Sequence, residues 1–93
     1  MKITVHFHGI LADWVGTRSA NFELSFDASY SDLVKEIKRR FGHNLPEQIW
    51  DSEKKSFHQK VRAFRDGSAL DSGGHHKLAP GEELTFYLMI AGG

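Results

Sequence analysis

The sequence predicts an α+β fold in which one main helix packs across one face of a mixed sheet of four to five strands. Three observations support this prediction. Apolar and polar residues alternate in two early segments and one late segment, a single stretch between them has helical periodicity, and 93 residues are enough for one hydrophobic core. We therefore expect one domain over residues 1–93, with a flexible tail at residues 91–93.

The first 26 residues predict two strands that form a hairpin with a long connection. Alternation of apolar and polar residues is the period of a half-buried strand. Gly9 and Gly16 interrupt the segment between the strands, where we expect a short apolar turn that places Leu11 and Trp14 over the edge of the core. The alternating apolar residues of the two strands are Ile3, Val5, Phe7, Phe22, Leu24 and Phe26.

A helix is predicted from Tyr30 to Phe41. Ser29 precedes Asp32 by three residues, which is the spacing of a capping box with Asp in place of Glu, and apolar residues then recur at helical spacing. Gly42 follows the last apolar residue and is expected to take the left-handed C-cap conformation.

Residues 43–56 are polar and are expected to form a loop with one short helical turn, anchored on the core by Leu45, Ile49 and Trp50. Residues 57–64 predict a strand whose facing is left open, because Phe64 differs in parity from the other apolar residues. Asp66-Gly67 is a hairpin signal, and a very short edge strand is expected after it.

The last strand is predicted over residues 83–90, after a turn at Pro80-Gly81. It is the most hydrophobic of the strands, which predicts a central position in the sheet. Leu84, Phe86, Leu88 and Ile90 share one face, and Thr85, Tyr87 and Met89 share the other. A hairpin, a helix, further strands and a final central strand follow one another in the order of a β-grasp fold.

Composition excludes several classes of function. Twelve basic and twelve acidic side chains cancel, so no net field favours nucleic acid or a membrane surface. Cysteine is absent, which rules out disulfides, thiolate metal sites and cysteine nucleophiles. No apolar segment is long enough to span a membrane, and the N-terminus does not resemble a signal peptide. We expect a cytoplasmic protein without a metal site, although it has six histidines.

The chain ends in Gly92-Gly93 directly after the last predicted strand. Glycine has no Cβ, so such a tail can extend, rotate and enter a slot too narrow for side chains. Its carboxylate becomes a good electrophile once ATP converts it to an acyl-adenylate. Sulfide or a persulfide that displaces AMP then gives a thiocarboxylate, which lets a protein without cysteine carry sulfur.

Three segments resemble the MoaD/ThiS family of ubiquitin-like sulfur carriers: KITVHFHGILADWVG, SDLVKEIKRRFG and, above all, HKLAPGEELTFYLMIAGG. The resemblance spans the whole chain. It implies that an E1-like enzyme uses ATP to adenylate Gly93, that the resulting thiocarboxylate supplies a sulfur-accepting synthase subunit, and that no cofactor is bound permanently. The chain would be a protein co-substrate and not an enzyme, and in the molybdopterin branch it would be the small subunit of a molybdopterin synthase.

The resemblance also implies where partners bind. An outward aromatic side chain on the last strand commonly packs against the activating enzyme in this family, and Tyr87 occupies the matching position. Met89, His8, Leu70 and Ala91 are the other residues expected at this partner-binding surface.

The pathway has several alternatives. The molybdopterin branch is the first expectation because it is the commonest, but the residues before the diglycine are not the prolines of many molybdopterin-synthase subunits. The ending IAGG also resembles carriers for thiamine synthesis, and the segment WDSEKKSFHQK resembles longer carriers that serve cysteine synthesis. A ubiquitin-like protein modifier, in which Gly93 is joined to lysines, or a simple binding module is the alternative from another class.

Overall fold

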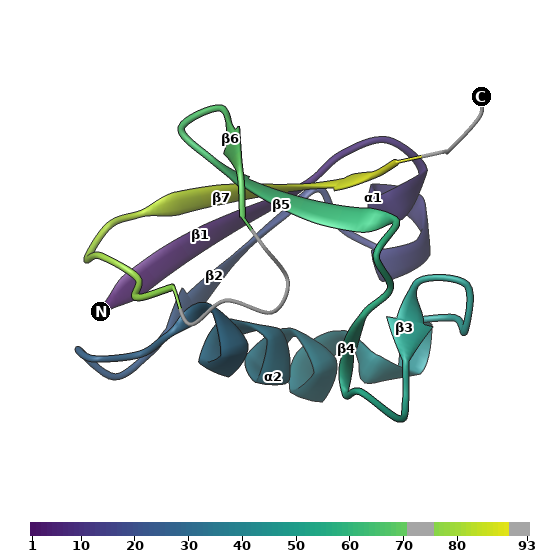
Figure 1. Cartoon of the computed structure of the whole chain (residues 1–93), viewed down its shortest axis with the longest axis horizontal. Helices are drawn as coiled ribbons and strands as arrows, with labels where there is room; N and C mark the ends of the chain where they lie inside the picture. Colours follow the sequence, from purple (N-terminus) through teal and green to yellow (C-terminus); the bar gives the residue numbers. More distant parts are fainter. Residues whose placement is uncertain (71–75, 90–93) are drawn as a thin grey trace.

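The computed structural model describes residues 1–70 and 76–89 of the chain. Its main sheet has five strands in the order β2-β1-β7-β5-β6 (Figure 1). These strands are β1 (Lys2–Phe7), β2 (Ser19–Glu23), β5 (Val61–Arg65), β6 (Ser68–Ala69) and β7 (Glu83–Leu88).

Strand β7 lies at the centre of the sheet, as its hydrophobicity predicts. It runs parallel to β1 and antiparallel to β5, whereas β1 and β2 form the expected antiparallel pair. The sheet is therefore mixed, and the parallel pair places the C-terminal ends of β1 and β7 at the same end of the molecule. Both the fold class and the central position of the last strand are confirmed.

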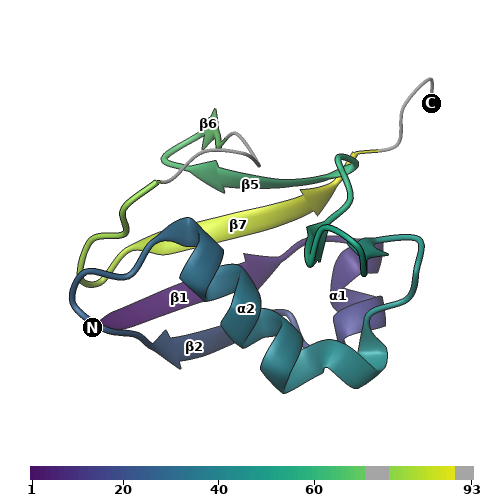
Figure 2. The same cartoon turned by 60° about the horizontal axis from the view of Figure 1, so that its bottom comes forward.

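Helix α2 (Tyr30–Phe41) crosses one face of the sheet (Figure 2). Its capping box is present: the Ser29 backbone N–H donates to the Asp32 carboxylate at 2.9 Å, and the Asp32 backbone N–H donates to the Ser29 hydroxyl. The prediction for Gly42 is wrong, because this residue has φ −55° and ψ −31° and begins the 3₁₀ helix η1 (Gly42–Asn44). The helical backbone thus continues past the predicted end in a tighter turn.

The connection between β1 and β2 contains a helix, α1 (Ile10–Val15), where a turn was expected. Leu11, Ala12 and Val15 share one buried side of it, at the spacing that packs a helix on a core. Gly16 ends the helix with φ 97°, and its N–H donates to the Ala12 carbonyl at 2.8 Å.

The strand predicted over residues 57–64 is in fact two elements. Strand β4 (Ser56–Phe57) pairs with β3 (Trp50–Asp51) in a separate two-stranded sheet, and β5 begins at Val61 after a turn in which the Val61 N–H donates to the His58 carbonyl. The rings of Trp50 and Phe57 meet edge to face, with centroids 5.3 Å apart, and both side chains are buried. Packing of these two rings explains why the polar segment folds back as a hairpin.

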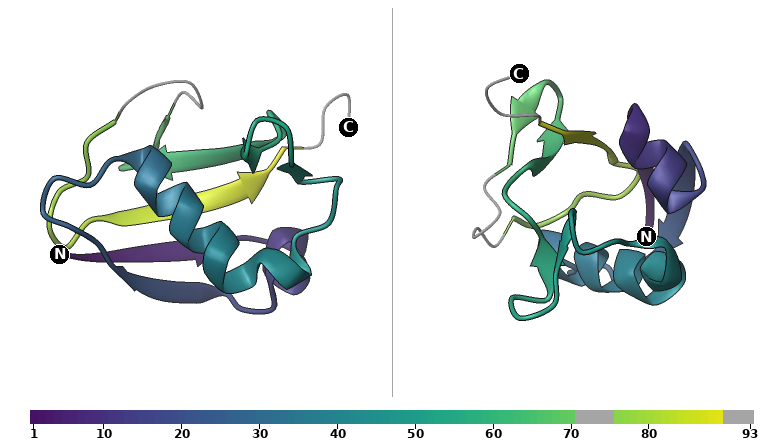
Figure 3. Two further views of the ribbon diagram at one scale, coloured as in Figure 1. Left: turned by 90° about the horizontal axis from the view of Figure 1, so that it is seen from below. Right: turned by 90° about the vertical axis from the view of Figure 1, so that its right-hand side faces the viewer.

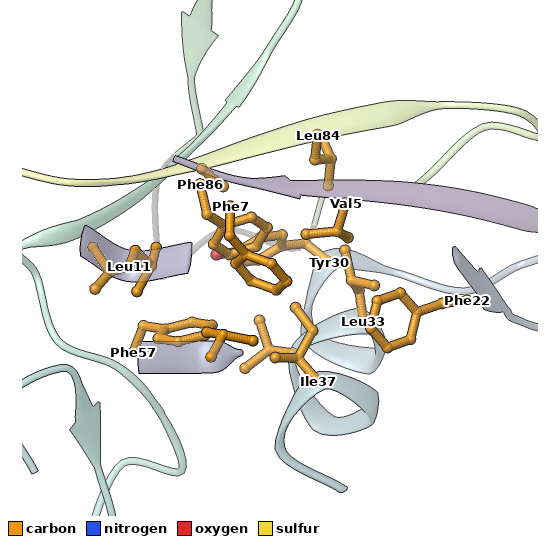
Figure 4. Close-up of a cluster of buried hydrophobic side chains, with 14 of the residues drawn as sticks. Val5, Phe7, Leu11, Phe22, Tyr30, Leu33, Ile37, Phe57, Leu84 and Phe86 are labelled. Carbon is orange, nitrogen blue, oxygen red and sulfur yellow. The ribbon is translucent and has the colours of Figure 1, made fainter. Parts of the chain in front are cut away.

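One hydrophobic core lies between the sheet, α2, α1 and the β3-β4 hairpin (Figure 4). Phe86 is at its centre: its ring lies 5.9 Å from that of Phe7, 6.2 Å from that of Tyr30 and 5.5 Å from that of Phe57, between centroids. The expected anchors Ile49 and Trp50 are buried in it, and Leu45 packs against it.

Phe26 is an exception to the predicted pattern of burial. Strand β2 ends at Glu23, and Phe26 follows in a loop with 81% of its side chain exposed. The Ala28 N–H donates to the Ser25 carbonyl in this loop, so the chain turns before Phe26 can continue the alternation.

The hairpin signal at Asp66-Gly67 is confirmed between β5 and β6, where both residues have positive φ, 49° and 82°. Gly81 also has positive φ, and the Glu82 N–H donates to the Ala79 carbonyl across the predicted turn. Two turned views show how these turns and the loop before α2 gather at one end of the sheet, away from α1 (Figure 3). None of the helices in residues 1–70 and 76–89 is long and apolar enough to cross a membrane.

Candidate partner-docking surface

The face of the sheet opposite α2 carries the candidate site. Because side chains alternate along a strand, the residues between the core positions of β1, β5 and β7 point to this open face. The register aligns them across the strands: His6 is opposite Thr85, Thr85 is opposite Phe64, and Tyr87 is opposite Arg62. The open face is polar toward β2 and aromatic toward β5.

Tyr87 is the centre of the aromatic part. Its ring centroid lies 4.7 Å from that of His8 and 5.2 Å from that of Phe64, which it meets edge to face at 87°. Tyr87 lies on β7, Phe64 lies on β5, and His8 comes directly after β1, so the three rings form a row across the sheet. Met89 comes directly after β7, and 46% of its side chain is exposed. We call these four residues, His8, Phe64, Tyr87 and Met89, the aromatic surface.

The strand pairing explains why these rings meet. The His8 backbone N–H donates to the Phe86 carbonyl at 3.0 Å, which extends the parallel β1–β7 ladder by one residue and places His8 beside Tyr87. On the other side, the antiparallel β5–β7 pair places Phe64 opposite Thr85, one pleat from Tyr87. The arrangement is therefore fixed by backbone hydrogen bonds on rigid strands.

The aromatic surface borders a shallow hollow, and a hydrogen-bonded pair of polar side chains lies near it. The His6 ring Nε2 lies 2.7 Å from the Glu83 carboxylate, and both side chains are substantially exposed. Aromatic side chains at the floor and charged or polar groups at the rim are typical of a surface that binds another protein. The hollow is lined by Phe64, Asp66, Gly67, Glu83, Thr85, Tyr87 and Met89.

The structure brings three of the residues predicted at the partner-binding surface to one face: His8, Tyr87 and Met89. It does not bring Leu70 there. The Leu70 N–H donates to the Ala63 carbonyl, and the Leu70 side chain is partly buried against the core, on the side of the sheet that faces α2. The short edge strand therefore turns Leu70 away from Tyr87.

Phe64 is the residue of this surface that sequence reasoning missed. Its parity, opposite to that of Val61 and Ala63, was the available signal: both of these residues are buried in the core, so Phe64 projects to the open face. Phe57 obscured the pattern because it lies on another strand.

The predicted reactive residues Gly92 and Gly93, and the predicted contact residue Ala91, lie outside the described residues, as does Ile90. The last of the described residues is Met89, whose backbone N–H donates to the Lys60 carbonyl at 2.5 Å. Met89 thus belongs both to the aromatic surface and to the segment that leads to the diglycine.

No protein-family model and no curated protein sequence matches the chain. Solved structures do match it. SAMP1 from Haloferax volcanii, also described as small archaeal modifier protein 1, superposes with a TM-score of 0.82 at 19% identity, over 100% of both chains. The chain has the ubiquitin-like β-grasp fold. The predicted resemblance to ubiquitin-like sulfur carriers is confirmed at the level of the fold.

Two further solved structures share the fold at similarly low sequence identity. Urm1 from Trypanosoma brucei superposes with a TM-score of 0.74 at 17% identity, covering 99% of this chain and 95% of its own. A putative molybdopterin converting factor, subunit 1, from Pyrococcus furiosus superposes with a TM-score of 0.70 at 18% identity, covering 97% and 99%. At such identities the comparison establishes the fold, and function has to be argued from the surface and the tail.

Proposed function

We propose that this chain is a sulfur carrier whose reactive group is the carboxylate of Gly93. An E1-like enzyme docks on the aromatic surface and adenylates Gly93 with ATP. The chain then carries sulfur as a thiocarboxylate and donates it to a synthase subunit in cofactor biosynthesis. In this scheme the chain is a protein co-substrate, and ATP is consumed at the partner's active site.

The observation that carries the proposal is that Tyr87, the centre of the aromatic surface, lies on β7, and that the diglycine follows β7 in the sequence. Tyr87 lies on the open face near the end of β7, Met89 comes directly after the strand, and Gly92-Gly93 follow within four residues of Met89 in the sequence. A partner that binds Tyr87 therefore also holds the segment from which the C-terminal tail extends. The glycines have no side chain that would block a narrow active-site channel. Binding energy from a rigid sheet is used to position a reactive end.

The proposed chemistry balances in two steps. A carboxylate oxygen of Gly93 attacks the α-phosphorus of ATP, which forms the acyl-adenylate and releases pyrophosphate. Hydrosulfide then attacks the carbonyl carbon and AMP leaves with the oxygen that it gained, so one carboxylate oxygen is replaced by sulfur. Neither step needs a thiol of the chain, in agreement with the absence of cysteine.

We place the carrier in molybdopterin synthesis as the first candidate pathway. The structural likeness to a putative molybdopterin converting factor, subunit 1, supports this assignment, and the chain would then be the small subunit of a molybdopterin synthase. Deletion of the gene should remove molybdenum-cofactor activity from the cell. Loss of thiamine or cysteine synthesis instead would move the carrier to the corresponding alternative pathway.

A protein modifier is the second candidate. It is supported by the superposition on small archaeal modifier protein 1 over the full length of both chains. The chemistry of the two candidates is shared up to the adenylate, after which a lysine amine, and not hydrosulfide, attacks the carbonyl carbon. Covalent adducts of the chain in cell extract, lost on deletion of Gly93, would favour the modifier.

The adenylation step tests both candidates at once. The E1-like enzyme of the same organism should exchange radiolabelled pyrophosphate into ATP only when this chain is present. A chain that lacks Gly93 is the matched control, because it keeps the whole fold and the aromatic surface. Absence of exchange with a verified active enzyme would contradict the proposed activation of Gly93.

A further inference from the structure

Strand β2 forms one outer edge of the main sheet, so one of its sides has no neighbouring strand among the described residues. The ladder with β1 fixes which backbone groups face that side. The Phe7 N–H donates to the Arg18 carbonyl and the Leu24 N–H donates to the Met1 carbonyl, each at 2.8 Å. In an antiparallel pair, bonded and non-bonded positions alternate, so these two bonds set the phase of the whole ladder.

By this phase the backbone N–H and C=O groups of Ser19, Asn21 and Glu23 point away from β1. Two of these three outward carbonyls already accept hydrogen bonds from side chains. The Arg40 guanidinium donates from Nη1 to the Asn21 carbonyl at 2.7 Å, and the Thr17 hydroxyl donates to the Ser19 carbonyl at 2.9 Å. The edge is capped from within the chain.

Arg40 contacts an aromatic ring as well as the Asn21 carbonyl. Its guanidinium carbon lies 4.2 Å from the centroid of the Phe22 ring, and Phe22 itself is almost fully buried. Arg40 projects from the last turn of α2, so the helix that packs on the core also holds this cap over the sheet edge. A planar cation stacked on a ring and bonded to a carbonyl is held in place by both contacts.

We propose that the outer side of β2 is a strand-pairing surface that fits β2 of a second copy of this chain, and that Arg40 keeps it closed. Outward-facing residues form the bonded pairs of a new antiparallel ladder. A two-fold pair centred on Asn21 therefore joins its N–H and C=O to those of Asn21 of the second copy. The Asn21 carbonyl is the group to which Arg40 donates, so the guanidinium competes with the N–H of the second copy for this acceptor.

The side chains of β2 are compatible with this pairing. In the two-fold register, Ser19 stands opposite Glu23 of the second copy, so no two like charges face each other. Ala20 stands opposite Phe22 on the side of the sheet that faces α2, which pairs a small residue with a large one. Unprotected edges of this kind pair readily, and natural sheets often guard them with charged side chains.

Analytical ultracentrifugation tests whether Arg40 prevents the pairing. The wild-type chain should sediment as a monomer, whereas Arg40→Ala should show a concentration-dependent dimer, with self-association strengthened about tenfold or more by loss of a charged hydrogen bond. Arg39→Ala is the matched control, because Arg39 lies beside Arg40 on α2 but contacts Glu36 at 2.8 Å and not the sheet edge. It should remain monomeric. Arg40→Ala that stays monomeric while folded, as judged by circular dichroism, would overturn the proposal.

A cross-link tests the register. The chain has no cysteine, so Asn21→Cys introduces a single thiol at the centre of the proposed pair. Directly opposite residues in a bonded pair have Cα atoms about 5.5 Å apart, within the span of a disulfide. Mild oxidation should link Asn21→Cys/Arg40→Ala about tenfold faster than Asn21→Cys/Arg39→Ala. Equal rates in the two variants, or a dimer of Arg40→Ala that Asn21→Cys does not link, would refute strand pairing at β2.

Discussion

Replacement of Tyr87 by alanine tests the aromatic surface. Tyr87 contacts His8 and Phe64 through its ring and lies on the open face, so Tyr87→Ala removes the centre of the surface and leaves the core residues of β7 in place. We expect the enzyme-catalysed adenylation of Gly93 to weaken while the fold persists. Steady-state ATP–pyrophosphate exchange, with the chain as the varied substrate, measures kcat/KM for this step.

The magnitude follows from the two kinds of contact. Within the chain, aromatic pairs contribute about 0.5–1.5 kcal/mol each, and a half-exposed ring gains less than a buried one, so Tyr87→Ala should cost about 1 kcal/mol of folding free energy. A tyrosine at the centre of a protein interface contributes about 2 kcal/mol or more to binding. This amounts to a decrease of about 30-fold in kcat/KM, since each 1.4 kcal/mol is a factor of ten.

Phe26→Ala is the matched control, because Phe26 is an exposed aromatic residue that precedes α2 in a loop outside the aromatic surface. It should leave kcat/KM within about twofold of wild type, as most surface substitutions outside an interface do. If Tyr87→Ala activated as fast as Phe26→Ala, the partner would not dock on the aromatic surface.

Three further predictions concern the fold. Phe86→Ala should lower the free energy of unfolding by about 3–5 kcal/mol, because Phe86 is fully buried among three other rings; urea denaturation measures this loss, and a cost below about 1 kcal/mol would contradict its central place. Gly67→Ala should cost about 1 kcal/mol in thermal melts, because φ is 82° although no atom would contact the new Cβ; an unchanged melt would refute the strain. The Ser29 backbone N–H lowers the pKa of Asp32, so the ionised carboxylate stabilises the fold above the ordinary carboxyl pKa of about 3.9, and this stabilisation is lost as the pH falls through the lowered value. The difference in unfolding free energy between wild type and Asp32→Asn should therefore disappear in acid. A difference that does not depend on pH would contradict the capping role.

The sequence patterns that predicted correctly either depend on local chemistry or repeat over the whole length of an element. The capping box sets the start of α2, the alternation of apolar residues identifies β1 and β7, and positive φ at Asp66-Gly67 forms the hairpin. Helix α1 was missed because six residues are too few for a helical period to emerge. Strands β3 and β4 have two residues each, and packing of Trp50 on Phe57 defines them more than any pattern does.

The candidate surface was predictable in part for a similar reason. Parity along β7 places Tyr87 on the open face, but its contact with His8 depends on the parallel pairing of strands from opposite ends of the chain. The facing of Phe64 depended on where β5 begins, which the turn at His58 determines. Leu70 was assigned to the surface from the family resemblance, whereas the structure packs its side chain against the core; the two-residue strand β6 gives no alternation from which its side could be predicted.

Intact-protein mass spectrometry tests the central claim most directly. The chain is incubated with the E1-like enzyme of its organism, ATP and sulfide, beside a chain that lacks Gly93. The carrier mechanism predicts that one oxygen is replaced by one sulfur in the full-length chain alone, with the added sulfur located on Gly93 by fragmentation. An unchanged mass with an enzyme of verified activity, or sulfur that also appears in the chain lacking Gly93, would contradict it.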